Sequence, residues 1–415
     1  MRKGRHTSVS VKGATMGKIV AASATVHAPQ LFFRPPSEDP AQLDADIAAM
    51  RVIGRDLDEV KPDAVIVIGN DHLETFFLTS VPTFAIMAGE RARAEYAGKE
   101  YDLAVHQGIA EDLLHKLVDH GFDMAYSQEA VLGHSFAAVY EWVIEKRSVP
   151  VVPIFVNAYL PPLPTARRCQ ALGQAIGKIL ADRPERVAIV ASGGMSHFPG
   201  TWKYAKPDFE FDYWAIAQME KSNYEPLLNM TSEQLDEVGN TELLPWMVLF
   251  GIIGSQPAEL ITYQPTWHHG HAVLRFLPDK RTGKPSREAL QAPASYTFKN
   301  SGGYEFYKHP SPAAFKLNKV LYDLRFRYEL RMRILTDLPS VQKEYNLNAE
   351  ETKVLETLQD DDIERFKSGT VHPLVKMGAH PLGMWMSVLL MHSEVRKLRA
   401  ATAAKQAGEK APART

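Results

Sequence analysis

Three histidines stand directly after short apolar runs of the sequence. His27 follows KIVAASATV, His72 follows AVIVIGND, and His197 follows VAIVASGGMS. In open α/β sheets, ligands collect outside the carboxyl ends of the strands, so polar side chains placed there are available for chemistry. A single histidine of this kind is more often a buried residue that is hydrogen-bonded to its neighbours and has no catalytic role. Three of them at the ends of predicted strands favour a shared site.

A carboxylate, Glu242, precedes the apolar run LLPWMVLFGII. Pro245 is compatible with the first turn of a helix, so we expect a buried helix that begins after Glu242. Burying a carboxylate is costly unless the group is paired or bound to a metal. The alternative is a solvent-exposed carboxylate favoured by the helix N-terminus. Two imidazoles and one carboxylate, without a thiolate, suit non-haem Fe(II), and Zn²⁺ can use the same ligands.

Short apolar runs alternate with amphipathic stretches through the first two thirds of the chain. KIVAAS, AVIVIG, VVPIFV, VAIVAS and AELITY are typical of strands buried on both faces. The intervening stretches AQLDADIAAMRVIGRDLDEV and RRCQALGQAIGKILAD have patterns that predict helices. The alternation indicates an α/β domain over residues 18–277, with a helix-covered central sheet in which AELITY is the last strand.

The composition then changes twice. Residues 278–312 are polar, which predicts a linker that wraps over a surface. In residues 313–395, apolar side chains recur at helical spacing from Leu317 onward, and Asn348 with Glu351 predicts a capping box. No strand pattern follows, so we expect a small, all-helical domain. This domain is expected to complete the site, in its own chain or across a dimer.

Length and composition set further bounds. The chain has 415 residues, which favours two domains, and 45% of them are hydrophobic. A formal net charge of −2 gives no electrostatic reason to expect a nucleic-acid or membrane partner. The single cysteine, Cys169, excludes an intrachain disulfide and favours the reducing cytoplasm. There is no apolar run long enough to span a membrane. Residues 1–17 are expected to form a flexible extension, and residues 396–415 a disordered tail.

Five short motifs together resemble a known family. ATVHAP, IGNDH, LGHSF, SGGMSH and GNTELLPW are similar to the successive motifs of class III (type II) extradiol ring-cleavage dioxygenases, of the protocatechuate 4,5-dioxygenase β-subunit type. Residues 317–355 resemble the small helical α subunit of the same enzymes. The chain therefore resembles a fusion of the two subunits in one polypeptide, as in gallate dioxygenases.

The resemblance implies an enzyme and a site. His27, His72 and Glu242 would bind Fe(II), His197 would be the acid–base histidine, and His134 of LGHSF would lie beside the substrate. His197 and His134 would both contact the substrate, and His134 would stabilise a developing oxyanion. The implied reaction inserts both atoms of O₂ into an aromatic ortho-diol and opens the ring. The implied assembly is a homodimer.

Some residues depart from the gallate-cleaving relatives. Ala28 follows the first histidine, where those relatives are expected to have threonine. The end of the helical region contains His372, His380 and Trp385, with Lys376 as its one obvious cation. This neighbourhood favours a diol without a carboxylate, such as a dihydroxypyridine (hydroxypyridone), with gallate or protocatechuate as the alternative.

Three further questions stay open at this level. The TWHHGH segment, residues 266–271, is expected to be a polar loop, with contacts to the site as the alternative. A zinc-dependent hydrolase on the same scaffold is a second functional class, against which the α-subunit-like region argues. A non-catalytic binding protein is a third class, and the presence of both His134 and His197 argues against it.

Overall fold

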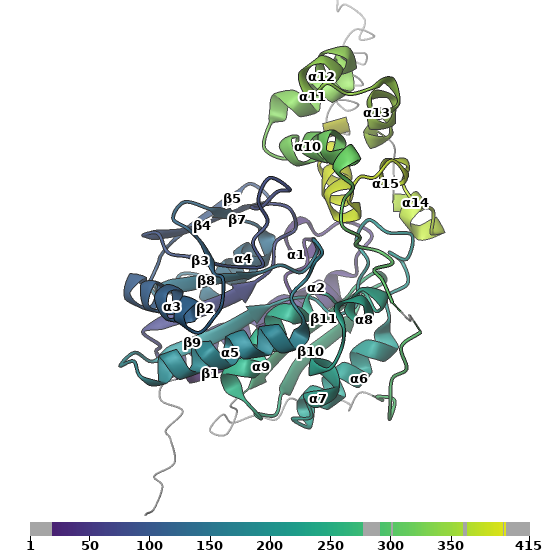
Figure 1. The fold of residues 1–415 in the computed structure, drawn as a ribbon. Helices are drawn as coiled ribbons and strands as arrows, with labels where there is room; N and C mark the ends of the chain where they lie inside the picture. The colour runs from purple at the N-terminus through teal and green to yellow at the C-terminus, as the bar shows by residue number, and fades with distance from the viewer. Residues whose placement is uncertain (1–18, 277–290, 300–301, 360–362, 393, 396–415) are drawn as a thin grey trace, which may run out of the picture.

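The computed structural model describes residues 19–276, 291–299, 302–359, 363–392 and 394–395. Its centre is an eight-stranded mixed sheet with the order β10-β11-β1-β9-β2-β8-β3-β6 (Figure 1). These strands are β1 (Ile19–Thr25), β2 (Ala64–Gly69), β3 (Phe84–Met87), β6 (Ala125–Ser127), β8 (Val151–Val156), β9 (Val187–Ser192), β10 (Glu259–Pro265) and β11 (Gly270–Phe276). The inner strands β1, β9, β2 and β8 are parallel to one another. The predicted α/β class is confirmed.

Helices cover both faces of this sheet. The helices of this part are α1 (Gln30–Phe33), α2 (Pro40–Val60), α3 (Gln107–Asp119), α4 (His134–Val139), the π-helix η1 (Tyr140–Ile144), α5 (Ala166–Ala181), α6 (Phe209–Glu220), α7 (Glu225–Leu228), α8 (Ser232–Glu237) and α9 (Leu243–Ile253). The helix α9 packs on β1, β2, β9 and α5, whereas α2 packs on β1, β10 and β11 (Figure 1). Every residue of β2, β8 and β9 is buried, as their continuous apolar runs predict.

The expectation that AELITY is the last strand is wrong. It forms β10, but β11 follows it and lies between β10 and β1, antiparallel to both. The strand β11 is not an apolar run, because it contains His271 and Arg275. Each has a partner from elsewhere in the chain: His271 Nδ1 lies 2.7 Å from Asp46 Oδ2, and Arg275 Nε lies 2.6 Å from Glu259 Oε2. These pairings allow a polar segment to be buried in the sheet.

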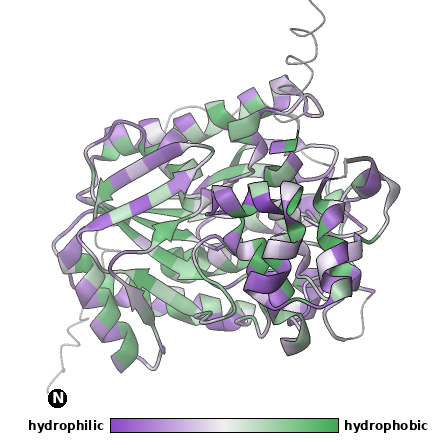
Figure 2. Cartoon of the chain, turned by 90° about the horizontal axis from the view of Figure 1, so that it is seen from above, coloured by the Kyte–Doolittle hydropathy of each residue, from purple (hydrophilic) through white to green (hydrophobic). Residues whose placement is uncertain are grey.

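A small second sheet was not anticipated. It has the order β5-β4-β7, with β4 (Arg91–Tyr96), β5 (Lys99–Ala104) and β7 (Val131–Leu132). The charged residues of β4 and β5 alternate with apolar ones, so only one face is buried and no continuous apolar run marks the hairpin. Figure 2 shows hydrophobic residues along the central strands and a mixture of hydrophilic and hydrophobic residues in the outer elements.

The C-terminal region is helical, as expected, with no strand in its described residues. Its elements are η2 (Pro312–Ala314), α10 (Phe315–Asp323), α11 (Tyr328–Thr336), α12 (Leu338–Tyr345), α13 (Ala349–Val354), η3 (Leu355–Gln359), α14 (Ile363–Ser368), α15 (Pro373–Lys376) and a helix over residues 381–392. The predicted capping box is present, since Asn348 and Glu351 exchange two hydrogen bonds of 2.8 Å. A second apolar core holds these helices together.

The segment between the two cores lies partly outside the described residues, as do the predicted extension 1–17 and tail 396–415. Its described residues contain no helix or strand before η2. The backbone N–H groups of Phe306 and Tyr307 both donate to Asp236 at 2.9 Å. Tyr307 is buried and its ring packs against Tyr159. No helix among the described residues is long and apolar enough to cross a membrane.

Candidate active site

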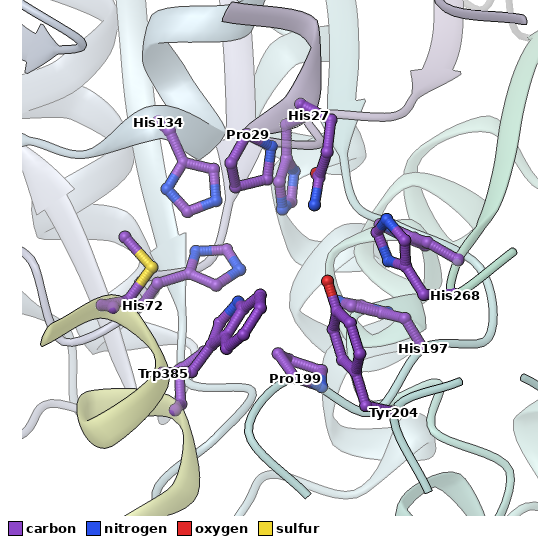
Figure 3. A pocket seen from close by; sticks show the side chains of 13 residues that line it. His27, Pro29, His72, His134, His197, Pro199, Tyr204, His268 and Trp385 are labelled. Atoms are coloured by element: carbon purple, nitrogen blue, oxygen red, sulfur yellow. The ribbon is translucent and has the colours of Figure 1, made fainter. Parts of the chain in front are cut away.

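Three parallel strands end at one pocket. The order β1-β9-β2 makes these strands neighbours, and His27, His197 and His72 follow their carboxyl ends by a few residues. All three side chains line the same pocket, together with His134 from the first residue of α4 (Figure 3). The structure therefore brings together the histidines that the sequence singled out, at the edge of the sheet where ligands are expected.

Glu242 lies beneath these histidines and is completely buried. It is the N-cap residue of α9, but its side chain makes no capping hydrogen bond. Instead, Oε1 lies 2.7 Å from His72 Nε2, and Oε2 lies 3.1 Å from His27 Nε2. The backbone N–H of Gly194 also donates to Oε2, at 2.5 Å. The alternative of a solvent-exposed carboxylate at a helix end is therefore wrong.

Burial alone would raise the pKa of the Glu242 carboxyl, but His27 and His197 hold that pKa well below its usual range. Burial, followed by the neighbouring His134, lowers the pKa of His72 to about 3. The group is thus an ionised carboxylate beside a neutral imidazole. In the part of the chain that the structure describes, no lysine or arginine contacts this carboxylate. A buried anion without a permanent cationic partner is unfavourable.

The hydrogen bonds of His27 show how a metal ion would fit. Ser192 Oγ donates to the Ser135 carbonyl at 2.6 Å, so it must accept from His27 Nδ1 at 2.9 Å. In the neutral ring, His27 Nε2 then has a lone pair, and it faces the Glu242 carboxylate. Two acceptors at this distance need a proton or a metal ion between them. Ligand atoms bound at right angles to one ion, each at about 2.1 Å, lie about 3 Å apart.

His134 offers a second set of donor atoms. Its Nδ1 lies 2.9 Å from Glu74 Oε2, and its Nε2 has no hydrogen-bond partner. One ring nitrogen from each of His27, His72 and His134 lies within 4.8 Å of the others, so these three residues could also hold a metal ion. Glu74 in turn faces Arg325, whose Nη2 lies 3.6 Å from Oε1. Both candidate ligand sets share His27 and His72.

His197 lies beside this cluster and is oriented from two sides. Its Nδ1 donates to the Met195 carbonyl at 2.8 Å, which leaves Nε2 as the acceptor in the neutral ring. Its ring stacks on His269, with centroids 3.9 Å apart and planes at 13°. The distance from His197 Nε2 to Glu242 Oε1 is 3.6 Å. A nitrogen held near the carboxylate in this way is well placed to accept a proton.

Tyr159 was missed by the sequence reasoning. Its hydroxyl lies 3.1 Å from His197 Nε2 and donates to Glu242 Oε1 at 2.9 Å. It follows β8, the parallel neighbour of β2, so its place at the edge of the sheet is the same as that of the histidines. The signal was the NAY segment directly after the run VVPIFV, a fourth strand end with polar side chains.

The pocket has a free volume of about 30 Å³, which is narrow for a small-molecule site. It is lined by His27, Pro29, Gln30, His72, His134, His197, Pro199, Tyr204, His268, His269, Leu382, Trp385 and Met386. The last three belong to the C-terminal helix over residues 381–392, so the helical region does contribute to the pocket of its own chain. No lysine or arginine is among these lining residues, all of which the structure describes.

Two interpretations of the pocket wall need correction. His268 and His269 are buried and line the pocket, so TWHHGH is not simply a polar loop; its three histidines are all buried. Of the residues expected near the ring substituent, only Trp385 lines the pocket. Ala28, His372, Lys376 and His380 do not. The His380 ring instead bonds the Tyr159 carbonyl, with Nε2 at 3.0 Å.

Gly194 permits the close approach of Glu242 to the loop after β9. A Cβ at Gly194 would lie 2.9 Å from Glu242 Oε2 and would overlap His269 Nε2. Overpacking of this kind costs about 1–3 kcal/mol. We therefore expect Gly194→Ala to lower both the melting temperature and the metal content of the purified protein.

Gly108→Ala is the matched control for this prediction. Gly108 lies in the first turn of α3, and a Cβ there would lie 3.6 Å from Arg183 Nη2, which is an ordinary contact. This substitution should leave metal content unchanged. Normal metal content and stability in Gly194→Ala would show that the close approach is unimportant.

Comparisons with known proteins point to one family. Residues 21–275 match the family described as the catalytic LigB subunit of aromatic ring-opening dioxygenase. The 2,3-dihydroxyphenylpropionate/2,3-dihydroxicinnamic acid 1,2-dioxygenase of Klebsiella pneumoniae (strain 342) is 33% identical over 183 residues, which is 44% of this chain and 58% of that protein. The protein of the same description from Comamonas testosteroni is 33% identical over 186 residues, covering 44% and 57%.

The chain thus spans less than two thirds of the length of these curated relatives. Among solved structures, an uncharacterized protein from Escherichia coli K12 aligns with a TM-score of 0.45 and 15% identity, over 62% of this chain and 99% of that one.

Proposed function

Because the chain belongs to the family of catalytic LigB subunits of aromatic ring-opening dioxygenases, we propose that it is an Fe(II)-dependent extradiol dioxygenase. The reaction inserts both atoms of O₂ into an aromatic ortho-diol and opens the ring beside the diol. The observation that supports this proposal most directly is the buried Glu242 carboxylate, which faces the bare Nε2 of His27 at 3.1 Å.

In this proposal His27, His72 and Glu242 hold the iron. We prefer this set to the three-histidine set because Glu242 lies against both His27 and His72 and supplies a negative charge. Two imidazoles and one carboxylate on one side of an ion leave open positions for ligands. When bound there, Fe(II) would bind both the diol and O₂ and allow electron transfer between them without an external reductant.

His197 is the proposed acid–base residue. Its Nδ1 proton is engaged by the Met195 carbonyl, so Nε2 can accept a proton from a substrate hydroxyl and return it later in the reaction. Stacking on His269 fixes the plane of the ring. His269 therefore helps to hold His197 Nε2 where it can exchange a proton with the substrate.

His134 is proposed to contact the substrate. Because Nδ1 faces the Glu74 carboxylate, it carries the ring proton, and Nε2 is an acceptor in the neutral form. Burial lowers the pKa of His134 well below its usual value, with His27 as a further cause. A neutral His134 can accept a hydrogen bond from a substrate hydroxyl. It could stabilise an oxyanion, the role implied by the resemblance, only after protonation.

Tyr159→Phe should lower kcat by about tenfold while the iron content is unchanged. The hydroxyl donates to Glu242 Oε1, and its oxygen can accept from His197 Nε2 once that nitrogen carries a proton. A hydrogen bond to a charged group contributes about 1.5–3 kcal/mol. Steady-state oxygen uptake and metal analysis measure the two quantities. Tyr140→Phe is the matched control, because the buried Tyr140 hydroxyl has no hydrogen-bond partner. Parallel loss of iron and activity would instead place Tyr159 among the supports of the metal ligands.

The substrate is proposed to be a diol without a carboxylate, for which a dihydroxypyridine (hydroxypyridone) is the leading candidate. A carboxylate in a buried pocket needs a cationic or hydrogen-bonding partner, and the lining residues supply neither lysine nor arginine. Gallate and protocatechuate are the alternative substrates. Their preference would require a protonated histidine of the pocket, or a neutral donor of its wall such as Gln30 or Tyr204, to hold the carboxylate.

Anaerobic purification followed by metal analysis and oxygen uptake tests the proposal. We expect about one Fe(II) per chain, and oxygen uptake with 3,4-dihydroxypyridine or catechol that exceeds uptake with gallate or protocatechuate. Zinc without oxygen uptake would favour the hydrolase alternative, since Zn²⁺ accepts the same ligands. A protein that binds diols but holds no metal would favour the non-catalytic alternative.

We also propose the setting in which the chain works. Its one cysteine, Cys169, fits the reducing cytoplasm, and the resemblance implies a homodimer. The separate apolar cores support a division into a catalytic domain, residues 18–277, a linker, residues 278–312, and a helical domain, residues 313–395.

A further inference from the structure

A second carboxylate–imidazole pair lies at the pocket, formed by Glu38 and His268. His268 Nε2 lies 3.1 Å from Glu38 Oε1, and each side chain is only 2% exposed. Trp267 Nε1 donates to the same oxygen at 2.9 Å. Figure 3 shows His268 across the pocket from His72 and His134. The proposed reaction uses neither member of this pair.

The contacts determine which nitrogen of His268 carries the proton. Burial opposes ionisation of Glu38, but the contact with His268 holds the pKa of Glu38 below its usual value. The carboxylate can only accept, so His268 Nε2 must donate. Burial lowers the pKa of His268, so the ring is neutral and Nδ1 has a lone pair. This nitrogen makes no hydrogen bond to any residue that the structure describes.

We propose that His268, oriented by Glu38, accepts a hydrogen bond from a donor on the substrate ring, on the side away from the diol. The inference rests on the proposed function, because the diol must face His27, His72 and Glu242. The Tyr204 ring stacks on His268 with centroids 4.8 Å apart and planes at 11°, so the direction of the lone pair is fixed. The pocket would select by hydrogen-bonding type and not only by size.

Three diols differ at the relevant position. In its pyridone form, 3,4-dihydroxypyridine presents a ring N–H on the side away from the diol. Catechol presents C–H there, and protocatechuate presents a carboxylate that only accepts hydrogen bonds. His268 should therefore favour the pyridone and tolerate catechol. It should disfavour protocatechuate, because His268 Nδ1 and the facing carboxylate are both acceptors and would be left unpaired.

The test is anaerobic equilibrium binding to the full-length, Fe(II)-loaded protein, in which no turnover occurs. The wild-type protein should bind 3,4-dihydroxypyridine about tenfold more tightly than catechol, the usual effect of one hydrogen bond in a buried site. His268→Phe, which keeps an aromatic ring against Tyr204, should bind the two ligands with equal affinity. Its affinity for the pyridone should fall, and its affinity for catechol should stay unchanged.

Other outcomes would overturn the inference. If His268→Phe still prefers the pyridone over catechol, the inference is wrong. If that preference is lost in Gln30→Leu but kept in His268→Phe, Gln30, which also lines the pocket, recognises the N–H instead. The wild-type protein gives a second readout that does not depend on folding of a variant: 3-hydroxy-1-methyl-4-pyridone, which lacks the N–H, should lose the preference over catechol. Equal wild-type affinities for pyridone and catechol overturn this inference alone. If neither ligand binds, the proposed function fails as well.

Discussion

The His72→Ala substitution should abolish iron retention and ring cleavage together. His72 Nε2 lies 2.7 Å from Glu242 Oε1, and both candidate ligand sets include this residue. Without His72, only His27 and Glu242 of the proposed ligands would remain. We expect the wild-type protein to carry about one Fe(II) per chain, and the variant to lose it on dialysis. Metal analysis and oxygen uptake with a catechol measure the two effects.

The matched comparison is His134→Ala, which distinguishes the two ligand sets. If Glu242 is a ligand, this variant keeps its iron and loses only catalytic efficiency, whereas Glu242→Ala loses its iron. If instead the three histidines bind the metal, His134→Ala loses its iron and Glu242→Ala keeps it. Thermal unfolding of each variant shows whether the fold is intact. Full iron occupancy in His72→Ala would contradict both assignments.

The parts of the fold that were predicted correctly depend on local pattern. Continuous apolar runs marked β2, β8 and β9, because these strands are buried on both faces. The run after Glu242 marked α9, whose bounds, Leu243–Ile253, match the apolar stretch. The rule that parallel strands present polar residues at their carboxyl ends was enough to group His27, His72 and His197.

The parts that were missed depend on partners distant in the sequence. The strand β11 is buried because Asp46 and Glu259 pair with its polar residues, and nothing in GHAVLRF indicates those partners. His268 lines the pocket because Glu38 holds it. Periodicity cannot predict pairs of this kind, since the two members come from different elements. Only a search of every strand end would have added Tyr159.

A side chain of the helical region also contacts backbone carbonyls at the site, and a sequence pattern does not reveal such a contact. Arg325 Nη1 donates to the His72 carbonyl at 3.1 Å, and it donates to the Leu73 carbonyl as well. Arg325 also faces Glu74, which binds His134. One side chain of the helical region therefore braces two histidines of the pocket, while Trp385 covers it.

His197→Ala should retain iron but lower turnover by about 10² to 10⁴, the usual contribution of a general acid–base group. Its Nε2 is 3.6 Å from Glu242 Oε1, yet neither proposed ligand set requires it. Oxygen uptake under matched iron loading measures the loss. His309→Ala is the control, because His309 Nδ1 likewise donates to a backbone carbonyl, that of Pro161 at 2.7 Å, but outside the pocket. If iron falls in parallel with activity in His197→Ala alone, His197 binds the metal and the acid–base assignment is wrong.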